Sequence, residues 1–243
     1  LNKTAVFEKN LPNLKDKEKK TEYFTGEVDK VIAKVSSVRD KIPVKSATSL
    51  RIISLNVRGL ENRLSHSIRR EVLSYLFTQV VHADIIIMEE TKTVDSYEWY
   101  MFPEWHIVPS SNKYATNGVI LLVRPGLAPY IKKVDICDEE EVKGNLVAID
   151  CCFSGEGNDV RVIGMYYPTQ IPSLKQRIIE KLDQLVKEAS NKVVIAMDGN
   201  EFIKRESKKE LENYERIVTN NNLLNIFDGK PTFTAPDGSY SSL

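Results

Sequence analysis

The sequence predicts an α/β protein: a four-layered α/β sandwich in which two mixed β-sheets lie face to face, flanked by helices. Two observations predict this class. Short apolar runs rich in Val and Ile alternate with stretches of helical periodicity, which is typical of strands joined by helical crossovers. Gly-rich and polar turn segments also join some strands directly. Because a purely parallel sheet does not accommodate both kinds of connection, both sheets should be mixed.

The composition excludes some classes of protein. The 243 residues are 42% hydrophobic, enough for a sizeable core, and 34 basic residues balance 34 acidic ones. A nucleic-acid surface would therefore have to be a local patch. No apolar run is long enough to span a bilayer, so no membrane is expected. The three cysteines lack metal-binding spacing, which indicates reduced, buried thiols and a nuclear or otherwise intracellular location.

Two segments precede the main domain. Residues 1–25 are polar and lysine-rich and indicate a solvated tail, because acidic residues interrupt the basic run. Residues 26–49 are a predicted helix and linker. The helix spans 26–42, where apolar residues recur at spacings of three and four, and Pro43 ends it. Its apolar stripe must pack on the following domain or on a partner.

The main domain, residues 50–243, alternates predicted strands and helices. We expect strands at 52–56, 84–90, 105–108, 117–123, 146–153, 160–166 and 193–198, with a strand or extended segment at 227–233. We expect helices at 66–81, 174–189 and 206–220, where apolar residues have helical spacing. Residues 154–158 predict a hairpin turn.

Three predicted strands end in oxygen-bearing side chains. One ends at Asn56, one at Glu89 and Glu90, and one at Asp198 with Asn200 close behind. Carboxylate and amide oxygens are the ligands that a hard cation such as Mg²⁺ prefers. The alternative is that each is an ordinary strand-end acid or turn residue, because acids often follow strands.

Six short motifs follow one another between Leu50 and Leu243. They are Ser54-Leu-Asn-Val-Arg-Gly-Leu60, Ile85-Ile-Ile-Met-Glu-Glu-Thr-Lys92, Asn117-Gly-Val-Ile-Leu121, Met165-Tyr-Tyr-Pro168, Met197-Asp-Gly-Asn200, and Thr232-Phe-Thr234 with Ser239 to Leu243. In this order they resemble the endonuclease/exonuclease/phosphatase superfamily. The resemblance is greatest to the apurinic-endonuclease-like domain of LINE-type (non-LTR) retrotransposons.

The resemblance implies an endonuclease that depends on Mg²⁺, with Mn²⁺ as an alternative ion. It implies that Asn56 and Glu90 bind the metal. Asp198 would orient or deprotonate the attacking water, and Tyr166 and Asn200 would hydrogen-bond the phosphate. The products would be 3′-hydroxyl and 5′-phosphate ends, and in the retrotransposon branch the 3′-hydroxyl primes reverse transcription.

Several neighbouring side chains have open roles. Arg58, Lys92 and Asn117 are candidate phosphate or DNA contacts, although any exposed cation could make such a contact. Glu89 is expected at the surface or in support of the site rather than on the metal.

The identities of the catalytic tyrosine and of the general base are also undecided. Tyr167 competes with Tyr166 for the catalytic role, and only the spacing to Pro168 separates them. The histidines show no partner spacing, and His82 is expected to be a helix cap or a surface residue.

The sequence departs from the family pattern in two places. Met197 and Gly199 replace the flanking residues of a Gly-Asp-Phe-Asn motif. The family's terminal Asp and His do not follow Leu243, so we expect the C-terminal strands to be missing from this chain. A longer protein or another chain would then complete the fold, or the domain is degenerate.

Three functions compete. The first is the DNA endonuclease domain of a non-LTR retrotransposon protein, with DNA and a reverse-transcriptase region as partners. The second is a DNA-repair endonuclease or another phosphoesterase of the same superfamily. The third is a non-catalytic binding or scaffold module, docked through the 26–42 helix. Target-site preference and oligomeric state do not follow from the sequence.

Overall fold

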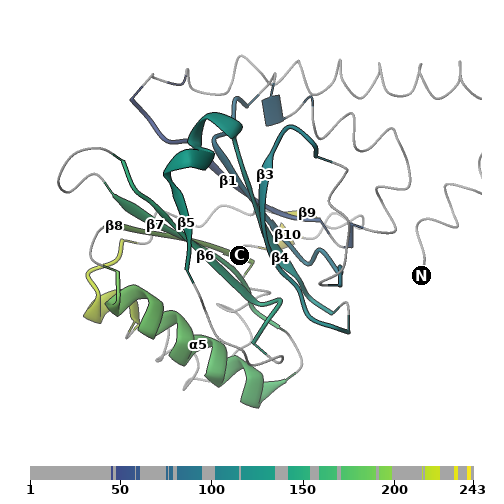
Figure 1. The fold of residues 1–243 in the computed structure, drawn as a ribbon. Helices are drawn as coiled ribbons and strands as arrows, with labels where there is room; N and C mark the ends of the chain where they lie inside the picture. The colour runs from purple at the N-terminus through teal and green to yellow at the C-terminus, as the bar shows by residue number, and fades with distance from the viewer. Residues whose placement is uncertain are drawn as a thin grey trace, which may run out of the picture.

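A computed structural model shows two β-sheets packed face to face (Figure 1). It describes residues 45, 48–57, 59–60, 75, 77–78, 81–94, 102–114, 116–134, 142–153, 159–168, 171–189, 192–198, 215, 217–224, 233–234 and 240–241. The predicted tail 1–25, the helix 26–42, the turn 154–158, Arg58 and Asn200 lie outside these described residues, as does most of the helices 66–81 and 206–220. The division into 1–25, 26–49 and 50–243 stays a prediction, as does the absence of C-terminal strands.

The first sheet has the strand order β1-β2-β4-β3. Its strands are β1 (Ile52–Asn56), β2 (Ile85–Glu89), β3 (His106–Ser110) and β4 (Val119–Val123). β1 and β2 are parallel, with Asn56 opposite Glu89. β4 is antiparallel to both β2 and β3, with Val119 opposite Glu89. β2 and β4 are buried throughout, and their sequences are apolar except for Glu89 at the end of β2.

The second sheet has the order β5-β6-β7-β8. Its strands are β5 (Ile131–Lys133), β6 (Leu146–Cys151), β7 (Val160–Tyr166) and β8 (Lys192–Asp198). β5, β6 and β7 are antiparallel neighbours, whereas β7 and β8 are parallel with Tyr166 opposite Asp198. The helix α5 (Pro172–Lys187) connects β7 to β8 and covers the outer face of this sheet (Figure 1).

These elements confirm the predicted fold class, because both four-stranded sheets are mixed and α5 lies outside them. The seven main strands and α5 begin and end within two residues of the predicted bounds. The sequence analysis missed the 3₁₀ helix η3 (Pro125–Tyr130) and β5, since Pro125 and Gly126 indicated only the end of β4. The predicted strand or extended segment at 227–233 reaches β9 (Phe233–Thr234), which pairs antiparallel with β10 (Tyr240–Ser241), a strand that was not predicted.

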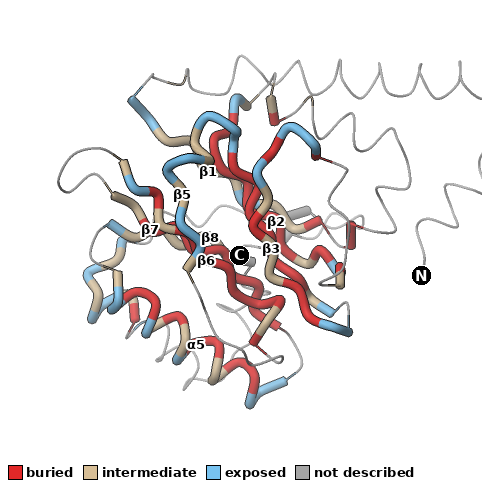
Figure 2. The backbone as a smooth tube through the Cα atoms, viewed as in Figure 1, coloured by how far each residue is buried: buried red, intermediate tan, exposed pale blue. Residues whose placement is uncertain are grey.

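The main core lies between the two sheets. Figure 2 shows buried residues running through both sheets and along one side of α5. The sheets approach most closely at Gly164 of β7, where an added Cβ would lie 2.7 Å from Ile87 Cγ2 and 3.1 Å from Val119 Cγ1. A glycine is needed at this position because neighbouring side chains already fill the space between the sheets.

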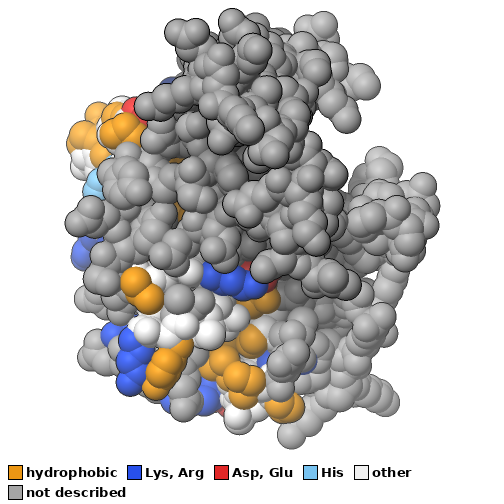
Figure 3. Space-filling model, turned by 90° about the vertical axis from the view of Figure 1, so that its right-hand side faces the viewer, with side chains coloured by type: hydrophobic (Ala, Val, Ile, Leu, Met, Phe, Trp, Pro, Cys, Tyr) orange, Lys and Arg blue, Asp and Glu red, His pale blue; other side chains and the backbone are white. Residues whose placement is uncertain are grey.

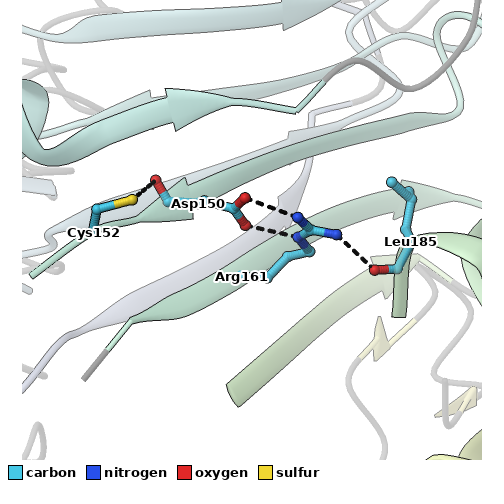
Figure 4. A network of polar contacts seen from close by, with 4 residues as sticks. All are labelled: Asp150, Cys152, Arg161 and Leu185. Carbon is cyan, nitrogen blue, oxygen red and sulfur yellow. Dashed lines mark hydrogen bonds and ion pairs between the residues drawn. The ribbon is translucent and has the colours of Figure 1, made fainter. Parts of the chain in front are cut away.

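An ion pair fastens α5 to the second sheet at the end of β7 far from Tyr166. Arg161 donates through Nε and Nη2 to the two carboxylate oxygens of Asp150 at 2.7 and 2.8 Å (Figure 4). Its Nη1 donates to the carbonyl oxygen of Leu185 at 2.8 Å. The hydrogen bond to Asp150 raises the pKa of Arg161, so this guanidinium stays charged although it is buried.

The cysteines correct one prediction. Cys151 is buried at the end of β6, and burial is the main cause that raises the pKa of its thiol to about 12. Cys152 is exposed, because neighbouring side chains in an extended chain point to opposite sides. Cys137 lies outside the described residues. No helix in the part of the chain that the structure describes is long and apolar enough to cross a membrane.

Candidate active site

The first half of the candidate site lies where β1 and β2 end. Because these strands are parallel, their carboxyl ends meet at one edge of the sheet. Asn56 is the last residue of β1, and its Nδ2 donates to Oε2 of Glu90 at 3.0 Å. The structure therefore brings together the two residues proposed as metal ligands, although metal binding itself stays a prediction.

The backbone around Glu90 is strained and is fixed by hydrogen bonds to Gly59 and Asn117. Glu90 and Lys92 have φ angles of 55° and 54°, in a left-handed region that residues with a side chain seldom adopt. Gly59 N donates to Glu90 O at 2.7 Å, and Lys92 N donates to Asn117 O at 2.7 Å. Strain maintained by surrounding hydrogen bonds is a common feature of functional sites.

Two acidic side chains follow one another here and have different environments. Glu89 is only 1% exposed and accepts a hydrogen bond from Ser54 Oγ, so of its two expected places the surface is excluded, and the supporting role stays a prediction. It is the last residue of a strand that is buried along its whole length. The carboxylate of Glu90 is partly exposed, and Oε1 lies 2.6 Å from the ammonium group of Lys92.

The second half of the site lies where β7 and β8 end. Tyr166 and Asp198 are opposite one another in the parallel register. Tyr166 belongs to the core between the sheets, whereas Tyr167 is buried beneath α5, with Lys175 Nζ 5.2 Å from its ring centroid. Of the two tyrosines, Tyr166 is therefore the one on the face that lies toward the first sheet.

The two halves are joined by hydrogen bonds at the same edge. Asn117 precedes β4, and its Nδ2 donates to Oδ1 of Asn145, which precedes β6, at 3.0 Å. Tyr166 N donates to Asn145 O at 2.8 Å, and Gly118 N donates to Gly144 O at 2.7 Å. Asn145 is fully buried, and the sequence analysis did not single it out. An asparagine after a glycine and before a strand has the signature of a turn residue.

The comparisons with known proteins are consistent with this geometry. No protein-family model and no curated protein sequence matches the chain. Solved structures do match. The AP endonuclease LMAP from Leishmania major aligns with a TM-score of 0.58 and 12% identity, over 82% of this chain and 79% of that one. The catalytic domain of human Nocturnin with a bound sulfate anion aligns with a TM-score of 0.53 and 13% identity, over 83% and 84%. The endonuclease domain of TRAS1, a telomere-specific non-LTR retrotransposon, aligns with a TM-score of 0.52 and 13% identity, over 77% and 78%.

The chain has the endonuclease/exonuclease/phosphatase fold. The fold expected from the sequence motifs is thus confirmed. At these identities the likeness establishes the fold, and it leaves the activity to be argued from this chain's own residues.

Within the endonuclease/exonuclease/phosphatase fold, the residues expected to touch DNA have different neighbours. Lys92 is half-exposed and paired with Glu90. Asn117 uses its amide nitrogen to bind Asn145, and its φ of 61° is a left-handed value that asparagine tolerates well. A DNA contact by either residue stays a prediction.

The described histidines lie far from the site edge. His106 begins β3 opposite Val123, whereas Glu89 pairs with Val119 at the other end of β4. His82 is exposed and precedes β2, which confirms that it is a surface residue. His66 lies outside the described residues. Neither described histidine is placed to act as a base at the ends of β2 and β7.

The donor set of the first half fits Mg²⁺. Glu90 supplies a carboxylate and Asn56 an amide oxygen, and the Asn56 nitrogen donates to Glu90. Mg²⁺ commonly takes one or two carboxylates and retains several waters. Among the described residues, no group of three or more His, Cys, Asp or Glu side chains is arranged around a common point. A sparse, all-oxygen set of this kind suits Mg²⁺ or Mn²⁺ better than Zn²⁺.

Proposed function

We propose that this chain is a Mg²⁺-dependent phosphodiesterase domain that nicks DNA, as part of a non-LTR retrotransposon protein. One observation carries the proposal. The strand ends that bear Asn56 and Glu90 meet, at one edge of the sandwich, the strand ends that bear Tyr166 and Asp198. The fold, shared with an AP endonuclease and a retrotransposon endonuclease domain, supports it.

Each half of the site would contribute a different part of the reaction. Glu90 and Asn56 would hold the metal ion, which when bound would draw charge from the phosphate and the leaving 3′ oxygen. Asp198 would orient or deprotonate the attacking water. Tyr166 and Asn200 would donate hydrogen bonds to the phosphate oxygens and fix the phosphate in line.

The DNA would lie on a local basic patch, because the net charge of the whole chain is zero. Figure 3 shows one face on which Lys and Arg side chains of the described residues are more in evidence than Asp and Glu. At the site edge, Lys92 is the described cation nearest Glu90, and Arg58 and Asn117 are the other proposed contacts.

Under the retrotransposon hypothesis, the nick would leave a 3′-hydroxyl that primes reverse transcription. A reverse-transcriptase region of the same protein, or another chain that completes the fold, would be its partner. The similarity to LMAP supports a repair-type endonuclease equally, and the choice of DNA substrate separates the two.

A second candidate function is a non-catalytic binding module on the same fold. The observation in its favour is the 2.6 Å contact of Lys92 Nζ with Glu90 Oε1, because an ammonium group there takes the place that a metal ion would need. This candidate predicts DNA or protein binding without any metal requirement.

The test uses supercoiled plasmid and an abasic-site duplex, each incubated with the protein and Mg²⁺. The assay compares residues 1–243 with a protein extended at its C-terminus by the coding sequence downstream of Leu243. Glu90→Ala and Asp198→Ala should each lower nicking by about a hundredfold or more, as removal of a principal catalytic group does. Glu180→Ala, an exposed change on α5, should leave nicking unchanged.

The outcomes separate the candidates. Nicking of intact plasmid supports the retrotransposon hypothesis, whereas cleavage confined to the abasic duplex supports a repair-type enzyme. Nicking that survives both substitutions at Glu90 and Asp198 would refute the site. DNA binding without nicking, in both versions of the chain, favours the non-catalytic module.

A further inference from the structure

The proposed active site is divided between two sheets. Asn56 and Glu90 belong to the first sheet, and Tyr166 and Asp198 belong to the second. A phosphate held by both halves reacts only if their separation is correct. Catalysis is sensitive to such geometry, since a misplacement of about 1 Å can lower a rate by about a hundredfold.

Asn145 is a described residue that contacts both halves. Its carbonyl oxygen accepts Tyr166 N at 2.8 Å, and its side-chain oxygen accepts Asn117 Nδ2 at 3.0 Å. The carbonyl oxygen of Asn117 accepts Lys92 N at 2.7 Å, two residues after Glu90. Two asparagines therefore link the strained segment of the first sheet to the tyrosine of the second.

The surroundings of Asn145 leave little freedom to adjust. Gly118 and Gly144 have φ angles of 94° and 82° and are joined by a 2.7 Å hydrogen bond. A Cβ added to Gly118 would lie 2.2 Å from Thr91 Oγ1. The side chain of Asn145 is 0% exposed, so its amide depends on protein partners rather than on water. Such a junction has one well-defined arrangement.

We infer that Asn145 is a positioning residue that sets the separation between the Glu90 half and the Tyr166 half of the site. The inference rests on the proposed function. Because Asn145 is fully buried, it cannot touch DNA, and its removal acts on turnover rather than on substrate binding. Its effect passes through Asn117, so the two residues act as a unit.

The test measures kcat, KM and the melting temperature Tm for variants in the nicking assay. Asn145→Ala removes the side-chain acceptor. Asn117→Gly removes the donor and keeps the left-handed backbone without strain. Asn117→Asp is the conservative variant, because the Asn145 amide can rotate and donate to the new carboxylate. Asn112→Ala is the matched control: Asn112 is 4% exposed and lies close to Gly144, but its described hydrogen bonds are to Thr116 and Tyr114 rather than to Asn117 or Asn145.

We expect Asn145→Ala and Asn117→Gly each to lower kcat by about tenfold or more, with KM changed by no more than about twofold. The double variant should be no slower than the slower single variant, and Asn117→Asp should recover most of the lost rate. Asn112→Ala should lower Tm as much as Asn145→Ala does and leave kcat unchanged.

Two results would overturn this inference and leave the proposed function intact. One is a loss of kcat in Asn145→Ala no larger than in the Asn112→Ala control at equal Tm. The other is an Asn117→Gly variant that raises KM at unchanged kcat, which would leave Asn117 with a DNA contact and no positioning role. If the unsubstituted protein nicks no DNA, the proposed function fails and this inference falls with it.

Discussion

Lys92 should weaken metal binding, because its ammonium group contacts the carboxylate that we propose as a metal ligand. Its Nζ is 2.6 Å from Glu90 Oε1, and the two side chains are 48% and 18% exposed. Lys92→Met removes the charge and keeps an apolar stem of similar length. We therefore expect this substitution to tighten the binding of a divalent cation at Glu90.

The magnitude follows from the exposure of the pair. Because solvent screens Lys92, the ion pair is worth about 0.2–1 kcal/mol, which is the range for exposed pairs. A metal ion that no longer displaces the ammonium group gains that free energy, so its Kd should fall by about 1.5- to 5-fold. The effect should shrink as ionic strength rises.

The assay follows the free Mn²⁺ signal by electron paramagnetic resonance as protein is added, with Mg²⁺ as a competitor. Lys187→Met is the matched control, because Lys187 forms an ion pair of the same 2.6 Å length with Asp183 on α5. It should leave the metal Kd unchanged. Glu90→Gln should weaken binding strongly, which ties the measured event to this carboxylate.

The reasoning would be refuted by a Lys92→Met variant whose metal Kd equals or exceeds that of the unsubstituted protein. A higher Kd would mean that Lys92 supports the site rather than competing for it. Metal binding that is unaffected by Glu90→Gln would remove Glu90 from the ligand set altogether.

Two further predictions concern the scaffold. Gly164→Ala places a methyl group 2.7 Å from Ile87 Cγ2 and should cost about 1–2 kcal/mol, lowering Tm by roughly 4 °C in thermal denaturation. Gly126→Ala, which meets nothing within 4 Å, should not lower Tm, and an equal change in both variants would contradict the close sheet contact. In a Cys137→Ser background, Ellman's reagent at pH 8 should react quickly with the exposed Cys152 and with Cys151 only on unfolding. The Cys151 thiol is buried, with a pKa raised to about 12. A second rapid thiol would count against this burial.

Local sequence patterns were sufficient for most of the fold. Strand bounds follow from apolar, β-branched runs, and α5 follows from its apolar stripe, because both signals depend only on neighbouring residues. β5 was missed because three residues, two of them lysines, carry too little apolar pattern. The place of Glu89 stayed undecided because polarity suggests exposure, whereas a strand buried along its whole length encloses even its last residue.

Tertiary structure decided which strand ends meet and which side chains face each other. Alternation along β7 places Tyr166 and Tyr167 on opposite faces, but only the packing of α5 shows which face lies toward the first sheet. The role of Asn145 depends on contacts with Asn117 and Tyr166, residues far from it in the chain or on another strand. The sequence by itself determined the seven main strands, α5 and the acids at the strand ends. Bringing these strand ends to one edge required the sheets to pack, because long-range contacts leave no trace in local periodicity.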